Sequence, residues 1–187
     1  YTDAAKMLAE QKLDIVSICL PTYLHAKYAV MALEAGVHVL CEKPMAMTPE
    51  ECDTVIAAAE ANKRELQVGH VIRFWPEFVW ARQAMMEGTY GKLLAAHFQR
   101  LSQTPTWSWQ NWLMDGEKSG GAALDLHIHD ADFVQYLLGM PRSVYSQAYS
   151  GPSKDIDHII TQYLYEGEVV VTAVGGWVMT KSFGFRQ

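Results

Sequence analysis

Apolar residues follow two spacings over the first 70 positions, one typical of helices and one typical of short strands. Helical spacing occurs in three segments, at 3–12, 22–35 and 48–63. Short runs rich in β-branched and apolar residues follow them, at 14–20, 37–41 and 66–70. Thr22 and Thr48 are candidate N-caps, and Gly36 is a candidate C-terminal stop. The pattern predicts a helix and then a βαβαβ unit with buried strands, which is half of a doubly wound parallel sheet.

The pattern changes after Arg73. Helical spacing returns at 77–87 and 121–138. Alternating or β-rich runs are found at 92–101, 143–149, 156–165 and 169–178. Glu166-Gly167 is a tight-turn dipeptide between the last two runs, so we expect a mostly antiparallel sheet. The sequence therefore predicts a partial α/β domain over 1–71 and an α+β domain over 72–187, whose sheet is incomplete because residues 183–187 show no closing element.

Composition narrows the classes of partner. The chain has 187 residues, half of them apolar, and a formal charge of -6, which argues against nucleic acid and favours small neutral or polar molecules. No apolar run is long enough to cross a membrane, so we expect no membrane contact. Cys19 and Cys41 fall in predicted buried strands, and the cysteine spacing fits no metal site, which favours a reducing cytoplasm. Because the chain begins at Tyr1, we expect its natural amino terminus to lie upstream.

Polar groups follow each strand of the first sheet. These groups are Thr22 and His25, then Glu42 and Lys43, then His70 and Arg73. The carboxyl ends of parallel strands share one edge, and ligands of open α/β sheets bind there. Pro44 fixes the backbone after Lys43, so this lysine is a candidate acid-base group. Taken singly, His25 also fits a helix surface, Arg73 a salt bridge at the domain boundary, and Glu42-Lys43 a surface ion pair.

A second candidate site lies at the start of the predicted helix over 121–138. On a regular helix Asp125, His129 and Asp132 project from one stripe, whereas His127 lies on a different face. A carboxylate beside an imidazole suits a general base near neutral pH, although the same pair can simply brace a helix. We expect no metal, because His-x-His does not share a helix face and no His-Glu-x-x-His pattern is present.

Three indoles lie close together before the Gly120-Gly121 turn. Trp107, Trp109 and Trp112 occupy a polar connection, where they suit either stacking on a sugar ring or packing within the loop. Arg100 precedes this connection and fits either a substrate contact or surface pairing.

Read together, these motifs resemble the Gfo/Idh/MocA family of oxidoreductases. The resemblance rests on Glu42-Lys43-Pro44 after a strand, on the run Asp14 to Thr22 followed by His25, and on Gly120-Gly121 leading to Asp125, His129 and Asp132. It spans essentially the whole chain. It implies the second half of a Rossmann-type sheet over 1–71 and a partial substrate-binding and oligomerisation domain over 72–187.

The resemblance also implies roles for individual residues. The implied activity is hydride transfer between NAD or NADP and a hydroxyl or carbonyl carbon of a sugar, cyclitol or related polyol. The catalytic residues would be Lys43, Asp125 and His129. The cofactor-binding residues would be Pro21, Thr22, His25, Glu42 and Lys43. The substrate-binding residues would be Lys43, Arg73, Trp109, Asp125 and His129, and a homo-oligomer would form through the sheet of the second domain.

One departure from the family pattern affects these expectations. No GxGxxG occurs in the chain, and Gly120-Gly121 cannot replace it, because that turn follows no parallel strand. We therefore expect an internal fragment that lacks the phosphate-binding half-domain and the last strands, and that is inactive by itself. The choice between NAD and NADP stays open, as does the alternative of a catalytically silent binding or assembly protein with the same fold.

Overall fold

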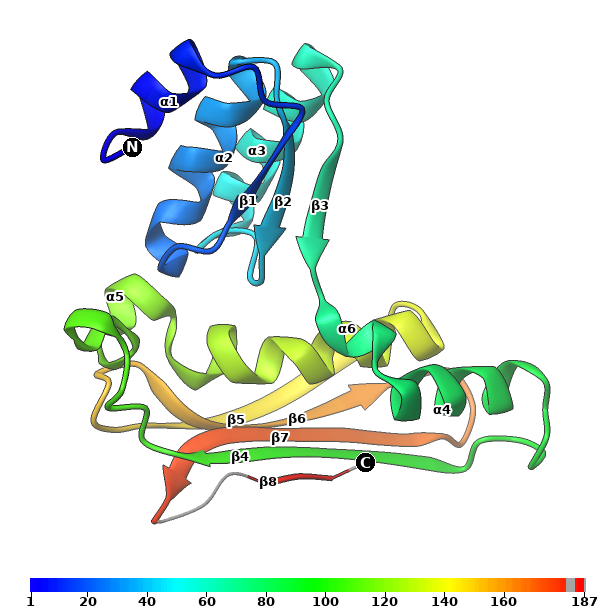
Figure 1. The fold of residues 1–187 in the computed structure, drawn as a ribbon. Coiled ribbons are helices and arrows are strands. Elements are labelled where there is room, and N and C mark those ends of the chain that lie inside the picture. Colours follow the sequence, from blue (N-terminus) through cyan, green and yellow to red (C-terminus); the bar gives the residue numbers. More distant parts are fainter. Residues whose placement is uncertain (181–183, 187) are drawn as a thin grey trace. The chain divides into compact units, whose positions relative to one another are not determined.

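A parallel sheet of three short strands forms the centre of the first unit of the structure, Tyr1–Gly69 (Figure 1). The computed structural model describes residues 1–180 and 184–186 of the chain. The strands are β1 (Ile15–Ile18), β2 (His38–Glu42) and β3 (Leu66–Gly69), in the order β1-β2-β3 and parallel throughout. The helices are α1 (Ala4–Glu10), η1 (Thr22–Leu24), α2 (His25–Glu34) and α3 (Pro49–Asn62). The predicted βαβαβ order is therefore confirmed.

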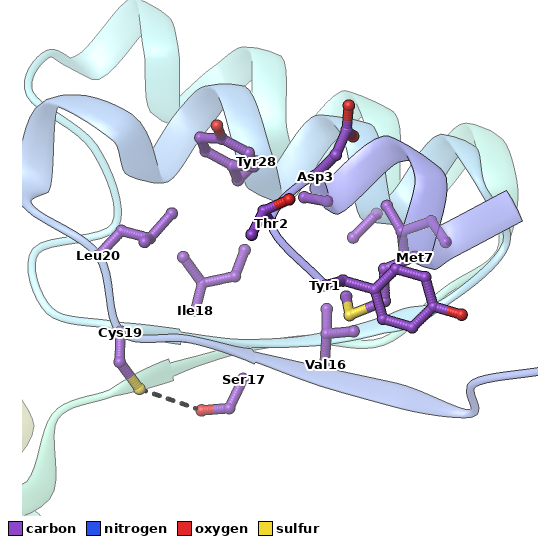
Figure 2. A pocket seen from close by; sticks show the side chains of 13 residues that line it. Tyr1, Thr2, Asp3, Met7, Val16, Ser17, Ile18, Cys19, Leu20 and Tyr28 are labelled. Carbon is purple, nitrogen blue, oxygen red and sulfur yellow. Dashed lines mark hydrogen bonds between the residues drawn. The ribbon is translucent and has the colours of Figure 1, made fainter. Parts of the chain in front are cut away.

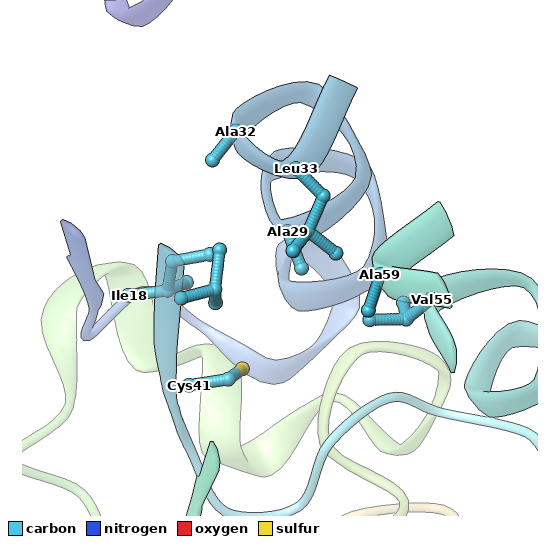
Figure 3. Close-up of a cluster of buried hydrophobic side chains, with 8 residues drawn as sticks. Ile18, Ala29, Ala32, Leu33, Cys41, Val55 and Ala59 are labelled. Carbon is cyan, nitrogen blue, oxygen red and sulfur yellow. The ribbon is translucent and has the colours of Figure 1, made fainter. Parts of the chain in front are cut away.

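Helices cover one face of this sheet within the first unit. Alternate strand residues such as Ile18, Val39 and Cys41 pack against Leu33 and Val55 of the helices (Figure 3). Full burial of a side chain such as Leu33 or Val55 contributes about 1.5–3 kcal/mol, so this cluster is a main source of stability for the unit.

The opposite face of this sheet is more exposed than the sequence predicted. Ile15 is 59% exposed and Leu40 is 41% exposed, because successive strand residues point to opposite faces and only one face is covered within this unit. The prediction that Cys19 is buried is also wrong. The strand ends at Ile18, and Cys19 lies beyond it with an exposed side chain.

The helix ends differ in how well the sequence predicted them. Thr48 caps α3 by accepting the Glu51 backbone N–H at 3.2 Å, as expected. Thr22 is not an N-cap. Pro21 begins a 3₁₀ turn in which the Leu24 N–H donates to the Pro21 carbonyl at 2.9 Å, so α2 begins three residues later than predicted and Thr22 is buried inside the turn.

The second unit, from His70 onward, is an α+β layer structure with a mixed sheet (Figure 1). Its strands are β4 (Ala95–Gln103), β5 (Ser143–Ser150), β6 (Ile156–Leu164), β7 (Val170–Met179) and β8 (Gly184–Arg186). The order is β5-β6-β7-β4-β8, with β4 and β7 parallel and the other neighbours antiparallel. The prediction of no element at the end of the chain is wrong for Gly184–Arg186, whereas Phe183 and Gln187 lie outside the described residues.

Helices cover one face of this second sheet. They are η2 (Val71–Phe74), α4 (Pro76–Met86), η3 (Trp109–Met114), α5 (Gly116–Ser119), η4 (Ala123–His127) and α6 (Ile128–Leu138). Phe133 of α6 lies at the centre of the core, with its ring 4.7 Å from that of Phe78 and 6.1 Å from that of Phe98. The predicted helix over 121–138 is present, but η4 is a π-helical turn inside it.

Candidate functional site

Glu42 and Lys43 lie at the carboxyl edge of the first sheet. Glu42 pairs with Gly69 across β2 and β3, and its carboxylate accepts the Lys43 backbone N–H at 3.3 Å. A Cβ built at Gly69 would lie 3.3 Å from the Glu42 carboxylate, so glycine leaves this carboxylate room beside the strand end. Glu42 is exposed, Lys43 is half-buried, and the Lys43–Pro44 peptide bond is cis. The strand end thus presents a carboxylate acceptor next to a lysine.

Pro21, Thr22 and His25 form the neighbouring turn after β1. Pro21 is half-buried, whereas Thr22 and His25 are buried. The two ring nitrogens of His25 lie 2.7 Å from the Pro44 carbonyl and 2.7 Å from the Leu20 carbonyl. His25 therefore links the turn after β1 to the loop after β2. With both polar atoms used on backbone carbonyls, its predicted contact with a cofactor remains a prediction.

A pocket of about 460 Å³ lies elsewhere in the first unit, between α1, α2 and β1 (Figure 2). Apolar side chains such as Met7, Val16 and Ile18 line it, together with Tyr1 and Tyr28. None of the predicted cofactor or catalytic residues lines this pocket, so its volume does not locate the candidate site.

The cysteine of β2 is not a candidate nucleophile. Burial raises the pKa of the Cys41 thiol to about 12, and the nearby Glu42 carboxylate adds to the shift. The reactive thiolate is therefore not populated near neutral pH.

In the second unit, a π-helical turn lies inside the helix on which Asp125 and His129 were predicted. η4 contains Asp125 and precedes His129, and a π turn closes i→i+5 hydrogen bonds, so it is slightly wider than an α-helical turn. His129 and Asp132 both lie in α6 at helical spacing, and the prediction that Asp125 shares their stripe stays a prediction. Asp125 and His129 are both half-buried. Their catalytic roles remain predictions.

His127 faces the sheet, where it meets Thr161 of β6. Its Nε2 lies 3.0 Å from the Thr161 hydroxyl, which lies 2.9 Å from the Ser146 hydroxyl. Burial lowers the pKa of His127 to about 4, so the ring is neutral at pH 7. A Cβ at Gly175 would lie 2.9 Å from the His127 Cβ, so the glycine provides the space for this side chain.

Asp132, the last member of the predicted stripe, holds Arg73. The Arg73 guanidinium donates to both carboxylate oxygens, one contact being 2.7 Å, and His70 Nδ1 lies 3.6 Å from the same carboxylate. The hydrogen bond to Asp132 raises the pKa of Arg73 above its usual value. Arg73 also lies over the Tyr136 ring at 4.6 Å from its centroid. The salt bridge considered for Arg73 is present, and its role in substrate binding remains a prediction.

A buried ion pair was missed by the sequence analysis. Arg100 of β4 donates to both oxygens of Asp130 of α6, at 2.9 and 3.1 Å, and both residues are buried. Arg100 therefore neither pairs at the surface nor is exposed to a ligand in this unit. The sequence did contain a signal for a buried ion pair. Asp130 shares the core face of α6 with Phe133 and Val134, and an acid on such a face needs a cationic partner.

The three tryptophans before the Gly120-Gly121 turn differ in how far their side chains are exposed. Trp107 is 77% exposed and Trp109 is 65% exposed, whereas Trp112 packs against a buried cluster that contains Leu113 and Trp177. Gln110 and Asn111 adopt left-handed backbone conformations, with φ of 49° and 56°, which reverse the chain between Trp109 and Trp112. One indole thus anchors the loop, and the other two remain available for contact with a ligand.

Within residues 1–180 and 184–186, no helix is long and apolar enough to cross a membrane. Over the same ranges, no group of three or more histidine, cysteine, aspartate or glutamate residues is placed to hold a metal ion.

Comparison with protein families matches both units. Residues 1–70 match the model described as the oxidoreductase family with an NAD-binding Rossmann fold, and residues 78–186 match the GFO/IDH/MocA C-terminal domain. The resemblance predicted from three motifs and the Rossmann-type α/β fold are therefore confirmed. The family model that matches residues 1–70 is described as NAD-binding, which agrees with the nicotinamide cofactor expected from the sequence.

Individual relatives agree with this result. The chain is 35% identical over 147 residues to a 2,7-anhydro-N-acetylneuraminate hydratase of Mediterraneibacter gnavus, covering 76% of this chain and 38% of that protein. It is 33% identical over 141 residues to a D-glucoside 3-dehydrogenase of Escherichia coli, covering 75% and 40%. The chain thus spans about two fifths of the length of these curated relatives.

A solved structure shows the same fold. The WlbA dehydrogenase from Bordetella pertussis, in complex with NADH and UDP-GlcNAcA, superposes with a TM-score of 0.89 at 21% identity, covering 97% of this chain and 54% of that one.

Proposed function

Since the chain belongs to the Gfo/Idh/MocA family of oxidoreductases, we propose that it transfers a hydride between a nicotinamide cofactor and a hydroxyl or carbonyl carbon of a sugar, cyclitol or related polyol. The observation that carries the proposal is the position of Glu42 and Lys43 at the carboxyl edge of a parallel sheet, where such folds bind ligands. The relatives at 35% and 33% identity are named a hydratase and a dehydrogenase, so the reaction type is itself part of the proposal.

The strand ends of the first unit suit part of a nicotinamide dinucleotide. A ribose offers hydroxyl donors, and the exposed Glu42 carboxylate, given room by Gly69, is an acceptor for them. Pro21 and Thr22 form the neighbouring turn, and His25 holds that turn to the loop that contains Lys43. When bound, the cofactor would supply the hydride acceptor or donor. Either NAD or NADP satisfies these contacts.

Lys43, Asp125 and His129 supply the proton chemistry in this proposal. Oxidation of an alcohol requires loss of the hydroxyl proton, and an ammonium beside the oxygen stabilises the developing negative charge. Lys43 provides this charge. His129 accepts the proton in oxidation and returns it in reduction, and Asp125 orients the substrate and the imidazole. Arg73 and Trp109 bind other parts of the substrate.

Substitution of Lys43 and His129 tests this proposal. In a full-length version of the protein, Lys43→Ala and His129→Ala are expected to lower turnover by about 10²–10⁴-fold, the usual contribution of a positioned proton-transfer group, while binding of NADH changes little. Turnover is followed by the absorbance of NADH with a panel of sugars and polyols. Lys12→Ala and His97→Ala are matched controls, because both side chains are exposed and lie outside the proposed site.

Two results would contradict the proposal. Unchanged turnover in either variant removes that residue from the mechanism. Consumption of a sugar without net formation or loss of NADH would show that the reaction is not a net redox step.

We also propose a homo-oligomer formed through the second sheet. Apolar and aromatic side chains on the strands of this sheet are exposed, among them Tyr145, Tyr149, Ile160 and Leu164. A second copy covering this surface would bury them, which is favourable at about 25 cal/mol per Å². Size-exclusion chromatography with light scattering should give a multiple of the monomer mass. A monomer at micromolar concentration would contradict this proposal.

A further inference from the structure

A polar pocket of about 570 Å³ lies in the second unit, and its lining does not include Asp125, His129 or Arg73. Two loops line it, one running through η3 into α5 and the other joining β5 to β6, at the same end of the sheet (Figure 1). The lining residues are Gln110, Asn111, Met114, Asp115, Gly116, Glu117, Ser153, Lys154 and Asp155. We call this cavity the loop pocket.

The two loops are joined firmly. The Gly116 N–H donates to the Ser153 carbonyl at 3.1 Å, and a Cβ at Gly116 would collide with the Asp155 side chain, so only glycine permits this approach. The buried Asp157 carboxylate accepts the backbone N–H groups of Gly151 at 2.8 Å and Ser153 at 3.1 Å. These hydrogen bonds within the protein hold the pocket in shape, so a ligand does not need to order the two loops when it binds.

The chemistry of the lining points to a neutral, hydroxyl-rich ligand. Amides such as those of Gln110 and Asn111 both donate and accept hydrogen bonds, carboxylates accept them and an ammonium donates them, which matches the hydroxyls of a sugar ring. The carboxylates of Asp115, Glu117 and Asp155 outnumber the ammonium groups of Lys154 and of Lys118, which pairs with Asp115 at 2.6 Å, so the net charge disfavours an anionic ligand.

An exposed indole directly precedes the lining residues in the chain. Trp109 directly precedes Gln110 and is 65% exposed, a large apolar surface left in water beside polar groups. The apolar face of a sugar ring stacks on an indole while the hydroxyls at its edge remain free to bond. Trp112 turns into the core at the other side of the reversed segment, so the loop that presents Trp109 is anchored.

From these observations we propose that Trp109 and the loop pocket form a subsite for a second, neutral sugar unit of a glycoside or oligosaccharide. The inference rests on the proposed function, because it names the substrate class of that same enzyme. The reacting unit would be handled by the proposed catalytic residues, and the second unit would contribute affinity and select for glycosides over free monosaccharides and over phosphorylated sugars.

Titration of the full chain with neutral disaccharides tests the subsite without any need for turnover. The probes are cellobiose, lactose, maltose and sucrose, each compared with its component monosaccharides and with glucose 6-phosphate. We expect at least one disaccharide to bind about tenfold more tightly than its monosaccharides, which is the size of one aromatic stacking contact plus a hydrogen bond. Nuclear magnetic resonance should show shifts of the amides of residues 109–116 and 153–155.

Variants locate the contact. Trp109→Ala and Asn111→Ala are expected to remove this tenfold preference, and Asn111→Ala is expected to leave monosaccharide affinity within twofold. Trp107→Ala is the matched control, because Trp107 is an exposed indole of the same loop that is not next to a lining residue in the chain. Thermal melts check that each variant is folded, and the exposure of Trp109 makes its substitution tolerable.

Three outcomes would overturn the subsite: no disaccharide preferred over its monosaccharides, a preference that survives Trp109→Ala, or a preference lost equally in Trp107→Ala. Its failure differs from failure of the proposed function. Loss of turnover in Lys43→Ala with no disaccharide preference would remove the subsite alone, whereas disaccharide binding at Trp109 with no redox activity would remove the proposed reaction alone.

Discussion

Two arginine–aspartate pairs on α6 have similar chemistry and different surroundings. Asp130 binds Arg100, and both side chains are less than 5% exposed, whereas Asp132 binds Arg73, whose side chain is 36% exposed. Burial raises the pKa of Asp130, although Arg100 opposes this shift, while Arg73 has its pKa raised by the hydrogen bond to Asp132. The comparison shows that burial decides the role of such a pair. The first belongs to the core, and the second lies where a ligand can still reach the guanidinium.

The largest expected effect follows from breaking the buried pair. Arg100→Met leaves the Asp130 carboxylate in the core without its cation, and we expect the free energy of unfolding to fall by about 3–5 kcal/mol. Urea unfolding at pH 7 measures it. The double variant Arg100→Met, Asp130→Leu should recover most of the loss, since it removes both charges. A loss below about 1 kcal/mol in the single variant would mean that the pair is solvated in solution.

His127 extends the comparison, because it is a buried titratable group of η4, directly before α6, and its Nε2 lies 3.0 Å from the neutral Thr161 hydroxyl. Its folded pKa of about 4 lies below the ordinary value of 6.5, so the unfolded chain binds a proton first as the pH falls. Its stabilising contribution is present above pH 6.5 and is lost toward pH 4. Between pH 7 and pH 5 this amounts to about 2 kcal/mol.

Urea unfolding at these two pH values measures the loss. His127→Gln keeps a hydrogen-bonding group near Thr161 but does not titrate, so the difference between wild type and variant isolates this histidine. An identical pH dependence in both proteins would show that His127 is accessible to protons in the folded state.

The smallest expected effect on stability follows from the half-exposed pair. Arg73→Gln should lower the free energy of unfolding by only about 1 kcal/mol, because water screens the lost charge interaction. If Arg73 binds substrate, the same variant should raise the KM of the sugar several-fold and leave kcat within about twofold, since uniform binding is lost. A stability loss as large as that of Arg100→Met would erase the difference between the two pairs.

The sequence predicted the first unit better than the second for a physical reason. Local rules that act within a few residues determine where the strands end, why Thr48 caps α3 and where Glu42 and Lys43 lie. The exposed face of the sheet was mispredicted, because burial depends on which elements cover a strand. Thr22 failed as a cap because Pro21 favoured a 3₁₀ turn first.

In the second unit, long-range contacts determine the features that the sequence did not reveal. The π turn over Ala123–His127 interrupts the helix that the sequence predicted as regular over 121–138. Arg100 and Asp130 are 30 positions apart, and no local pattern joins them. By contrast, packing within the loop, one of the two roles predicted for the three loop tryptophans, is found for Trp112, whereas stacking of the exposed Trp107 and Trp109 on a sugar ring stays a prediction.

The central claim is that Lys43 and His129 act in one reaction. A double-variant cycle on kcat/KM, measured by NADH absorbance with the best sugar of the panel, tests it most directly. Groups that act as a unit are strongly non-additive, so we predict that Lys43→Ala, His129→Ala lowers kcat/KM by about as much as the more severe single variant, roughly 10²–10⁴-fold. Multiplication of the two single effects in the double variant would contradict the account, because it would mean that the residues contribute independently.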